Sequence, residues 1–191
     1  KSAMVGGIIM NNASGMNCGT HANSDKMLLS VRIVMADGTI LDTGNETSKR
    51  DFAKKKPDFI KSIEALRDKI RNDEKLSERI RYKYSIKNVT GLNILPFVEH
   101  DDPFEIITHL MVGSEGTLAF LSEATMKTGY DYPFSASAML YFKDIKEACR
   151  AVVAMKKGPV MGAELLDSKS LSSVNDPTGE GLTAVLTETK A

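Results

Sequence analysis

Residues 31–41 read Val-Arg-Ile-Val-Met-Ala-Asp-Gly-Thr-Ile-Leu. Apolar residues alternate around Asp37-Gly38, a dipeptide that accepts the positive φ angles of a tight turn. This stretch therefore predicts a β-hairpin, and it indicates that a sheet forms part of the fold.

The segment after the hairpin changes from a strand period to a helical one. Its apolar residues recur at intervals of four and three, at Phe59, Ile63, Leu66 and Ile70. Pro57 suits the first turn of this helix, and Asn72-Asp73 begin a shorter second helix with Leu76 and Ile80 on one side. Three basic residues of the second helix are expected to face solvent rather than to hold a phosphate: Arg79, Arg81 and Lys83.

A third helix is predicted to begin at Asp102. Asp102 suits the N-cap, Pro103 the first helical position, and Glu105 completes a capping box three residues after the cap. Gly113 is expected to end this helix, and residues 117–127 predict a strand.

A domain boundary is expected near residue 131, where Gly-Tyr-Asp-Tyr-Pro looks like a short linker. Beyond it, Asp144 and Glu147 form a second capping box that predicts another helix. Three segments predict strands, at residues 137–142, 161–166 and 181–187.

Together these elements predict an α+β fold. The sheet is expected to be antiparallel or mixed, built from the hairpin and from the strand after Gly116. Helices at about 57–82 and 102–112 are expected to flank it.

Composition excludes several classes of protein. The chain has 191 residues, and its 25 Lys and Arg balance 25 Asp and Glu, so no bulk field attracts nucleic acid or anionic lipid. Hydrophobic residues make up 42% of the chain, which argues against disorder. Because no apolar run is long enough to span a bilayer and no secretory leader is recognisable, a cytoplasmic location is expected.

Cysteine and histidine spacing assigns no catalytic or metal-binding residue. Cys18 and Cys149 match no metal motif and are expected to be free buried thiols. His109 lies four residues after Glu105 and is expected on the solvated face of its helix.

The ends of the chain predict an excised fragment of a larger parent. The chain begins at Lys1 without an initiator Met and runs directly into an apolar stretch. Its last strand-like segment, residues 181–187, has nothing after it to pair with it or cover it.

Two glycine-containing segments could approach a ligand closely. Residues 6–20 contain four Gly and three Asn, which permit sharp turns and leave backbone N–H groups free. Taken alone, such a stretch is better explained as a turn-rich surface loop. Residues 112–118 have two Gly that leave room for a flat ring system. The spacing of this second segment is that of neither a Walker loop nor a Rossmann fingerprint.

Three ordered segments resemble a known family. They read "GGIIMNNASGMNCGT" at 6–20, "VRIVMADGTILDTG" at 31–44 and "VGSEGTLAFLSEATMK" at 112–127. In this order, with helices between, they resemble the second half of an FAD-binding domain of the vanillyl-alcohol oxidase type. Within that superfamily they are similar to the FAD-linked D-lactate dehydrogenase and glycolate oxidase family. Residues 80–116 resemble the longer members, which also carry iron–sulfur-binding parts.

The resemblance implies a domain organisation. Residues 1–130 would be the C-terminal half of the FAD-binding domain, and 131–191 the truncated start of the substrate domain, the α+β FAD-oxidase C-terminal domain. "AELLDSKSLSSV" at 163–174 is the most recognisable piece of the second part.

The resemblance also implies contacts to FAD, mostly through the backbone. The first segment would contribute Gly7, Asn11, Asn12, Ser14, Gly15, Gly19 and Thr20. The second would contribute Gly113, Glu115, Gly116, Thr117 and Leu118. His21 follows the first segment. A contact of this residue with the flavin is less favoured than a position away from it.

The activity implied for the parent is oxidation of a 2-hydroxy acid such as D-lactate, by hydride transfer to the flavin. The fragment is expected to be inactive and to lack FAD, because the pyrophosphate loop and the catalytic base lie outside it. The resemblance is also compatible with an iron–sulfur cluster elsewhere in the parent. It is compatible, too, with peripheral association of the parent with the inner membrane. The expected partners are the hydroxy acid, the missing halves of the parent and, through exposed apolar surface, a second copy of the fragment.

Two alternatives stay open. One is a non-catalytic binding or assembly module that retains the fold without flavin, supported by the ten Met residues. The other is an FAD-dependent reductase that uses a nicotinamide cofactor, which would share the domain but matches residues 113–118 less well.

Overall fold

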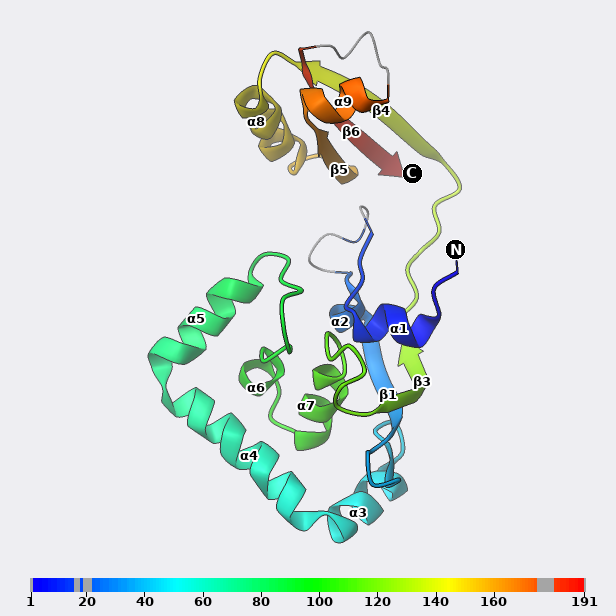
Figure 1. Ribbon diagram of the computed structural model, residues 1–191, viewed down its shortest axis with the longest axis vertical. Coiled ribbons are helices and arrows are strands. Elements are labelled where there is room, and N and C mark those ends of the chain that lie inside the picture. Colours follow the sequence, from blue (N-terminus) through cyan, green and yellow to red (C-terminus); the bar gives the residue numbers. More distant parts are fainter. Residues whose placement is uncertain (1, 16–17, 19–21, 175–180, 191) are drawn as a thin grey trace. The chain divides into compact units, whose positions relative to one another are not determined.

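The chain divides into two compact units (Figure 1). The computed structural model describes residues 2–15, 18, 22–174 and 181–190, without the side chains of residues 188 and 190. One unit comprises residues 1–14 and 20–128, and the other comprises residues 15–19 and 129–191. Each unit contains its own three-stranded sheet.

The sheet of the first unit has the strand order β2-β1-β3 and is antiparallel throughout. Its strands are β1 (Leu28–Val34), β2 (Ile40–Asp42) and β3 (Phe120–Met126). Ile33 lies opposite Leu41 on one side and Leu121 on the other. The predicted hairpin is confirmed, and so is the strand after Gly116, which begins a few residues later than expected.

The hairpin turn is longer than the Asp37-Gly38 dipeptide suggests. Of this pair only Gly38 has a positive φ, at 82°. The Met35 N–H donates to the carbonyl of Thr39 at 2.8 Å, and the Thr39 N–H donates to Oδ1 of Asp37 at 3.0 Å. A five-residue loop therefore replaces the tight two-residue turn, with the Asp37 carboxylate closing it.

Helices cover one face of this sheet. In Figure 1 they follow one another outward: α7 (Pro103–Leu110) packs on β1, α6 (Pro96–Glu99) on α7, and α4 (Pro57–Asn72) on α6. The helix α5 (Glu74–Tyr84) extends from α4, and α2 (Ser24–Met27) leads into β1. The core between these layers is apolar and includes Val31, Ile33, Ile63 and Ile106.

The predicted helix starts are confirmed by their caps. The side chain of Asp73 accepts a hydrogen bond from the Leu76 N–H at 3.0 Å, and that of Asp102 accepts from the Phe104 N–H at 2.9 Å. Ile63 and Ile70 are buried as the α4 period predicts. Leu66, predicted to lie on the same face, is instead 43% exposed.

Two helices of the first unit contradict the sequence interpretation. Residues 5–10, interpreted as the start of a turn-rich segment, form α1 (Val5–Met10), because burial of Ile9 and Met10 outweighs the low helix propensity of two glycines. The helix α3 (Glu46–Lys55) was not predicted at all. Asn45 caps α3 and Phe52 anchors it in the core.

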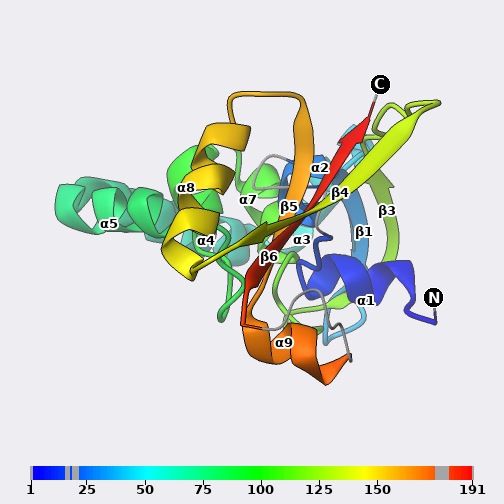
Figure 2. The same ribbon diagram turned by 90° about the horizontal axis from the view of Figure 1, so that it is seen from above.

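The second unit contains β4 (Ser135–Phe142), β5 (Val160–Leu166) and β6 (Thr183–Lys190) in the order β4-β6-β5, with β6 antiparallel to both neighbours. The helix α8 (Ile145–Met155) packs on this sheet, as does the unpredicted short helix α9 (Ser168–Ser173). Figure 2 shows β6 between its two partners. The predicted strands and the Asp144 cap of α8 are confirmed.

Helices and sheets occur in both units, so the predicted α+β class is confirmed. The identification of each unit with a particular flavoprotein subdomain is a proposal, which is taken up after the site.

Candidate functional site

The two segments singled out in the sequence meet in the first unit, although they are 104 residues apart. The backbone N–H of Glu115 donates to the carbonyl of Met10 at 3.0 Å. The side-chain amide of Asn11 donates to Oε1 of Glu115 at 2.7 Å. One backbone bond and one side-chain bond therefore join the end of α1 to the turn that follows α7.

Both segments contain backbone in the left-handed region at this junction. Asn12 has φ 54° and Glu115 has φ 53°, and Gly116 follows with φ 75°. A positive φ in a non-glycine residue costs free energy and is concentrated at functional sites and tight turns. Gly116 supplies such a conformation without a steric cost, and a Cβ added there would have open space around it.

Two buried polar atoms of the first segment have no hydrogen-bond partner within the described residues: Oδ1 of Asn12 and Oγ of Ser14. Asn12 is only 5% exposed. An unpaired buried polar atom is destabilising by roughly 1–3 kcal/mol, so each requires an explanation. A bound polar ligand would provide one.

The first segment is held by residues that the sequence interpretation missed. The Ser24 hydroxyl donates to the carbonyl of Ala13 at 3.0 Å, and the Lys87 ammonium donates to that of Ser14 at 3.4 Å. Asn23 caps α2, its side chain accepting from the Lys26 N–H at 3.2 Å. The Asn-Ser-Asp sequence at 23–25 carried the capping signal, whereas nothing local in the sequence marks Lys87 as a partner of Ser14.

The second segment is a compact turn after α7. The helix ends at Leu110, earlier than predicted, with Met111 as its C-cap, and Gly113 with φ 81° lies in the turn beyond it. The Thr117 hydroxyl donates to the carbonyl of Ser114 at 2.6 Å, and the buried Ser114 hydroxyl donates to that of Met111 at 2.8 Å. These two bonds fix the turn internally, and Leu118 packs against the core beneath it.

The remaining predicted contact residues differ in where the structure places them. Gly7 lies in α1 and Gly15 is exposed, and a Cβ added at either would meet nothing within 4 Å. Gly19 and Thr20 of the first segment, and His21 directly after it, lie outside the described residues.

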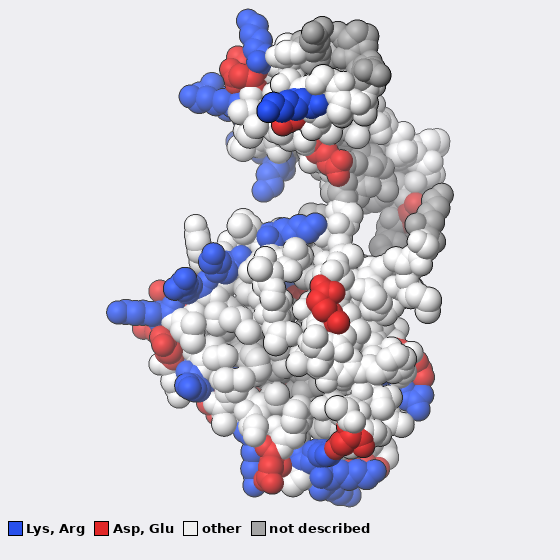
Figure 3. Space-filling model, in the orientation of Figure 1, with Lys and Arg blue, Asp and Glu red and all other residues white. Residues whose placement is uncertain are grey.

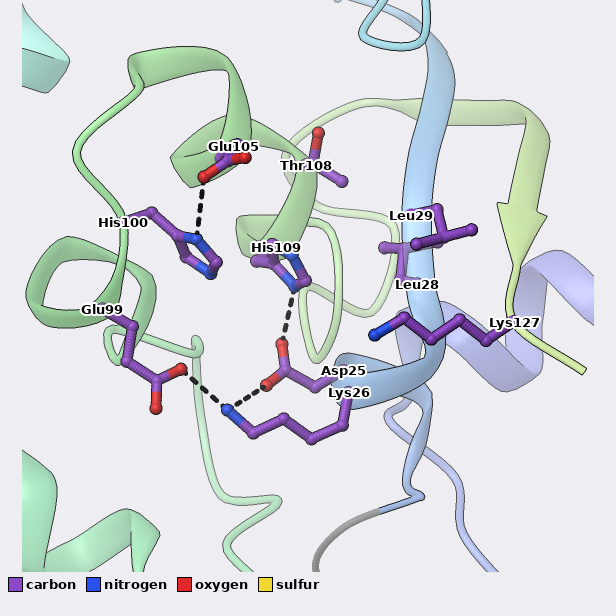
Figure 4. A pocket seen from close by; sticks show the side chains of 10 residues that line it. All are labelled: Asp25, Lys26, Leu28, Leu29, Glu99, His100, Glu105, Thr108, His109 and Lys127. Carbon is purple, nitrogen blue, oxygen red and sulfur yellow. Dashed lines mark hydrogen bonds and ion pairs between the residues drawn. The ribbon is translucent and has the colours of Figure 1, made fainter. Parts of the chain in front are cut away.

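A pocket of about 280 Å³ lies between α2, β1 and α7 (Figure 4). The buried carboxylate of Asp25 is at its base. Oδ1 of Asp25 accepts from the Asn93 side-chain amide at 3.1 Å and lies 3.2 Å from Nδ1 of His109. The His109 ring stacks on that of His100 with centroids 4.5 Å apart. The expectation that His109 faces solvent is therefore wrong, because the partner that buries it comes from a distant segment.

Among the described residues no group of His, Cys, Asp or Glu has the geometry of a metal site. None of the helices that the structure describes is long and apolar enough to cross a membrane. Cys18 and Cys149 are free thiols, but neither is buried as predicted: Cys149 is exposed and Cys18 is partly exposed.

Comparison with known families adds an independent finding. A family model described as an FAD binding domain matches residues 1–44, which include the first segment and the hairpin.

Curated relatives align with most of the chain. A D-2-hydroxyglutarate dehydrogenase of Haemophilus influenzae is 26% identical over 184 residues, covering 89% of this chain and 17% of the relative. A D-lactate dehydrogenase of Archaeoglobus fulgidus is 24% identical over 181 residues, covering 94% of this chain and 29% of the relative. A mitochondrial D-lactate dehydrogenase (cytochrome) of Saccharomyces cerevisiae is 25% identical over 175 residues, covering 91% of this chain and 21% of the relative.

These findings confirm the predicted resemblance to the FAD-linked oxidase and D-lactate dehydrogenase family. The chain spans less than a third of the length of each of these three relatives.

The residues present fit a flavin cofactor. The segment that the family model matches contains two buried polar atoms without a partner among the described residues. They are Oδ1 of Asn12, which can accept a hydrogen bond, and Oγ of Ser14, which can donate or accept one. Open space at Gly7, Gly15 and Gly116 would let a bulky ligand approach the backbone.

Proposed function

We propose that this chain supplies FAD-contacting segments of an FAD-dependent dehydrogenase that oxidises a 2-hydroxy acid such as D-lactate. The observation that carries the proposal is the junction of the two segments, where the Asn11 side chain bonds Glu115 and the Glu115 N–H bonds Met10. In this proposal residues 1–130 are the C-terminal half of the FAD-binding domain and 131–191 the start of the substrate domain.

The chain's own residues would bind and orient the cofactor. Asn12 and Ser14 carry polar atoms that are ready to pair with it, and a Cβ added at Gly15 or Gly116 would meet nothing within 4 Å. The side-chain bond from Asn11 to Glu115 would keep the two segments at a fixed distance. FAD, when bound, supplies the hydride acceptor for a hydroxy-acid substrate.

The base that accepts the hydroxyl proton is assigned to no residue of this chain, so we propose that the chain alone is inactive. An iron–sulfur cluster, if the full-length protein has one, would likewise belong to another part of it.

The proposal is tested by flavin binding. The 191-residue chain is compared with a longer polypeptide that extends it at both ends to the length of the relatives, and FAD retained after gel filtration is measured by absorbance. We expect the longer protein to retain FAD and to reduce it when a 2-hydroxy acid is added. A folded longer protein without FAD would overturn the proposal in favour of a binding module that retains the fold without flavin.

A further inference from the structure

The pocket between α2, β1 and α7 brings together charged and imidazole side chains that the proposed function does not use (Figure 4). Its lining residues belong neither to residues 6–20 nor to residues 112–118, the two proposed flavin-contacting segments. Its volume is about 280 Å³, whereas a water molecule in the liquid occupies about 30 Å³. The pocket therefore has room for a small ion together with several waters.

The carboxylates that face this pocket all have partners. Glu99 accepts a hydrogen bond from the Lys26 ammonium at 2.7 Å, and Glu105 and Asp25 each contact a histidine ring. The ammonium of Lys127, in contrast, has no partner among the residues that the structure describes. Figure 4 shows the Lys127 side chain extending across the start of β1 toward the other lining residues. The charge of the pocket that is left unpaired is thus positive.

The two histidine rings of the pocket are held parallel, and each carries a free nitrogen. His100 and His109 stack with an interplanar angle of 8°. Nδ1 of His100 lies 3.1 Å from Glu105, and Nδ1 of His109 lies 3.2 Å from Asp25. A carboxylate accepts hydrogen bonds and does not donate them, so the proton of each contact is on Nδ1. Nε2 of each neutral ring is then an acceptor without a partner among the described residues.

We propose that this pocket binds a small oxyanion that carries a hydroxyl group, of which hydrogen phosphate is the simplest. An anionic oxygen of the ligand would accept from the Lys127 ammonium, and its hydroxyl would donate to Nε2 of His109. In the view of Figure 4, His109 lies between Lys127 and His100. The buried side chain of Leu28 forms part of the wall, so these contacts are screened less than at an open surface.

The combination of a cation and an acceptor discriminates between anions. Sulfate and simple carboxylates have the charge but no hydroxyl to donate, so their lone pairs would face the lone pair of Nε2. A long-range field contributes little to this selection, because the chain has no net charge. Figure 3 shows Lys and Arg side chains among Asp and Glu on the visible face of the first unit.

Isothermal titration calorimetry on the 191-residue chain compares inorganic phosphate with sulfate at equal ionic strength. The titration is made at about pH 8, at the upper end of the range in which histidine ordinarily titrates. We expect saturable binding of phosphate and at least about tenfold weaker binding of sulfate, which lacks the hydrogen bond to Nε2. No saturable binding of phosphate, or equal binding of the two ions, would overturn the proposal.

A change of Lys127 locates the cation. Lys127→Gln should weaken phosphate binding at least about tenfold, while the backbone bond from its N–H to the carbonyl of Met27 is kept. The matched control is Lys54→Gln, which removes an exposed cation of α3 that does not line the pocket and should leave binding within about twofold. Equal losses in the two variants would overturn the assignment.

A change of His109 locates the acceptor. In His109→Asn the side-chain amide can still donate to Asp25, but Nε2 is removed, so phosphate should lose its preference over sulfate. Urea unfolding verifies that this variant is folded. In the unaltered chain the ring proton signals of His109 should shift on addition of phosphate and stay in place with sulfate. Phosphate binding that leaves these signals unchanged would also contradict the proposal.

This inference goes beyond the proposed function, and the two can fail independently because phosphate binding needs no flavin. In the longer polypeptide, phosphate should bind equally well with FAD in place, since the flavin-contacting segments do not line the pocket. Displacement of phosphate by FAD would assign the pocket to the cofactor and overturn the proposal.

Discussion

Gly15 gives the sharpest single-residue test of the flavin site. Its φ is not in the left-handed region, and a Cβ at this position would meet nothing within 4 Å. We therefore expect Gly15→Val to leave the free energy of unfolding of the chain within about 0.5 kcal/mol of its original value. In the longer polypeptide the same change should lower FAD retention at least tenfold, because the isopropyl group fills the space left for the ligand.

The control for Gly15 is Gly129→Val. Gly129 also lacks a positive φ and also has nothing within 4 Å of an added Cβ, but it lies in the linker. Equal FAD retention by the two variants, measured by absorbance after gel filtration, would remove Gly15 from the site.

Asp25 joins three segments that are distant in sequence. Its side chain is 8% exposed and bonds to Asn93 and His109, which precede and follow the α6–α7 turn. We expect Asp25→Asn to lower the free energy of unfolding by about 1–3 kcal/mol, because it replaces a buried charged acceptor with a neutral amide. Urea unfolding measures the change, and Asp51→Asn, an exposed carboxylate on α3, is the control. An equal effect of both substitutions contradicts this role.

The role of Asp25 also marks a limit of prediction from sequence. Asn23-Ser24-Asp25 signals a helix cap, yet the bond to His109 spans 84 residues and has no local signature. The spacing from Glu105 to His109 suggested a solvated helix face because a periodic pattern carries no information about a partner from another segment.

At the scale of elements, the closure of the hairpin loop is expected to depend on pH. The Lys56 ammonium, followed by the hydroxyl and N–H of Thr39, lowers the pKa of the Asp37 carboxyl well below its usual range. A lowered pKa in the folded state stabilises the fold above the unfolded pKa of about 4, and this contribution is lost as the pH falls through the folded value. Because the Asp37 carboxylate is exposed to water, solvent screens the effect and it should be small.

We expect Asp37→Asn to be slightly less stable than the original chain at neutral pH and equally stable in strong acid. Thermal unfolding followed by circular dichroism from neutral pH to pH 2 measures the difference. The control is Asp131→Asn, which removes an exposed carboxylate of the linker that has no described partner. A difference between Asp37→Asn and the original chain that does not shrink on acidification would contradict the prediction.

Two neighbouring helices, α3 and α4, show which elements the sequence could predict. The helix α4 repeats its apolar positions and was located from them. The helix α3 has one large apolar residue, Phe52, whose ring makes edge contacts with Phe59 and Phe104 at 6.0 and 6.5 Å. A single anchor has no period, so only the folded core reveals why α3 is a helix.

At the scale of the whole molecule, composition correctly indicated a folded protein but contains no information about where the charges lie. A net charge of zero excludes a bulk electrostatic field. The sequence interpretation placed Arg79, Arg81 and Lys83 of α5 in solvent, and all three are exposed. The structure adds an apolar groove beside Arg79 and Lys83, which depends on residues 88–94 folding back against the helix. The pairing of these cations with an apolar groove is a tertiary property that composition cannot contain.

We also propose that the isolated chain self-associates through the first unit. An apolar groove of about 510 Å³ lies between α1 and β3, and at its margin Met4 is 80% and Phe120 69% exposed. Apolar surface of this kind is unfavourable in water, and a second copy of the chain is the partner available in a pure sample. The weight-average molar mass from static light scattering should therefore rise with protein concentration.

Phe120→Ser should weaken this association several-fold, because it removes an exposed aromatic ring without opening the core. Leu66→Ser, an exposed aliphatic residue of α4 in the same unit, should leave it unchanged. A constant monomer mass across the concentration series would show that the groove does not bind a second copy.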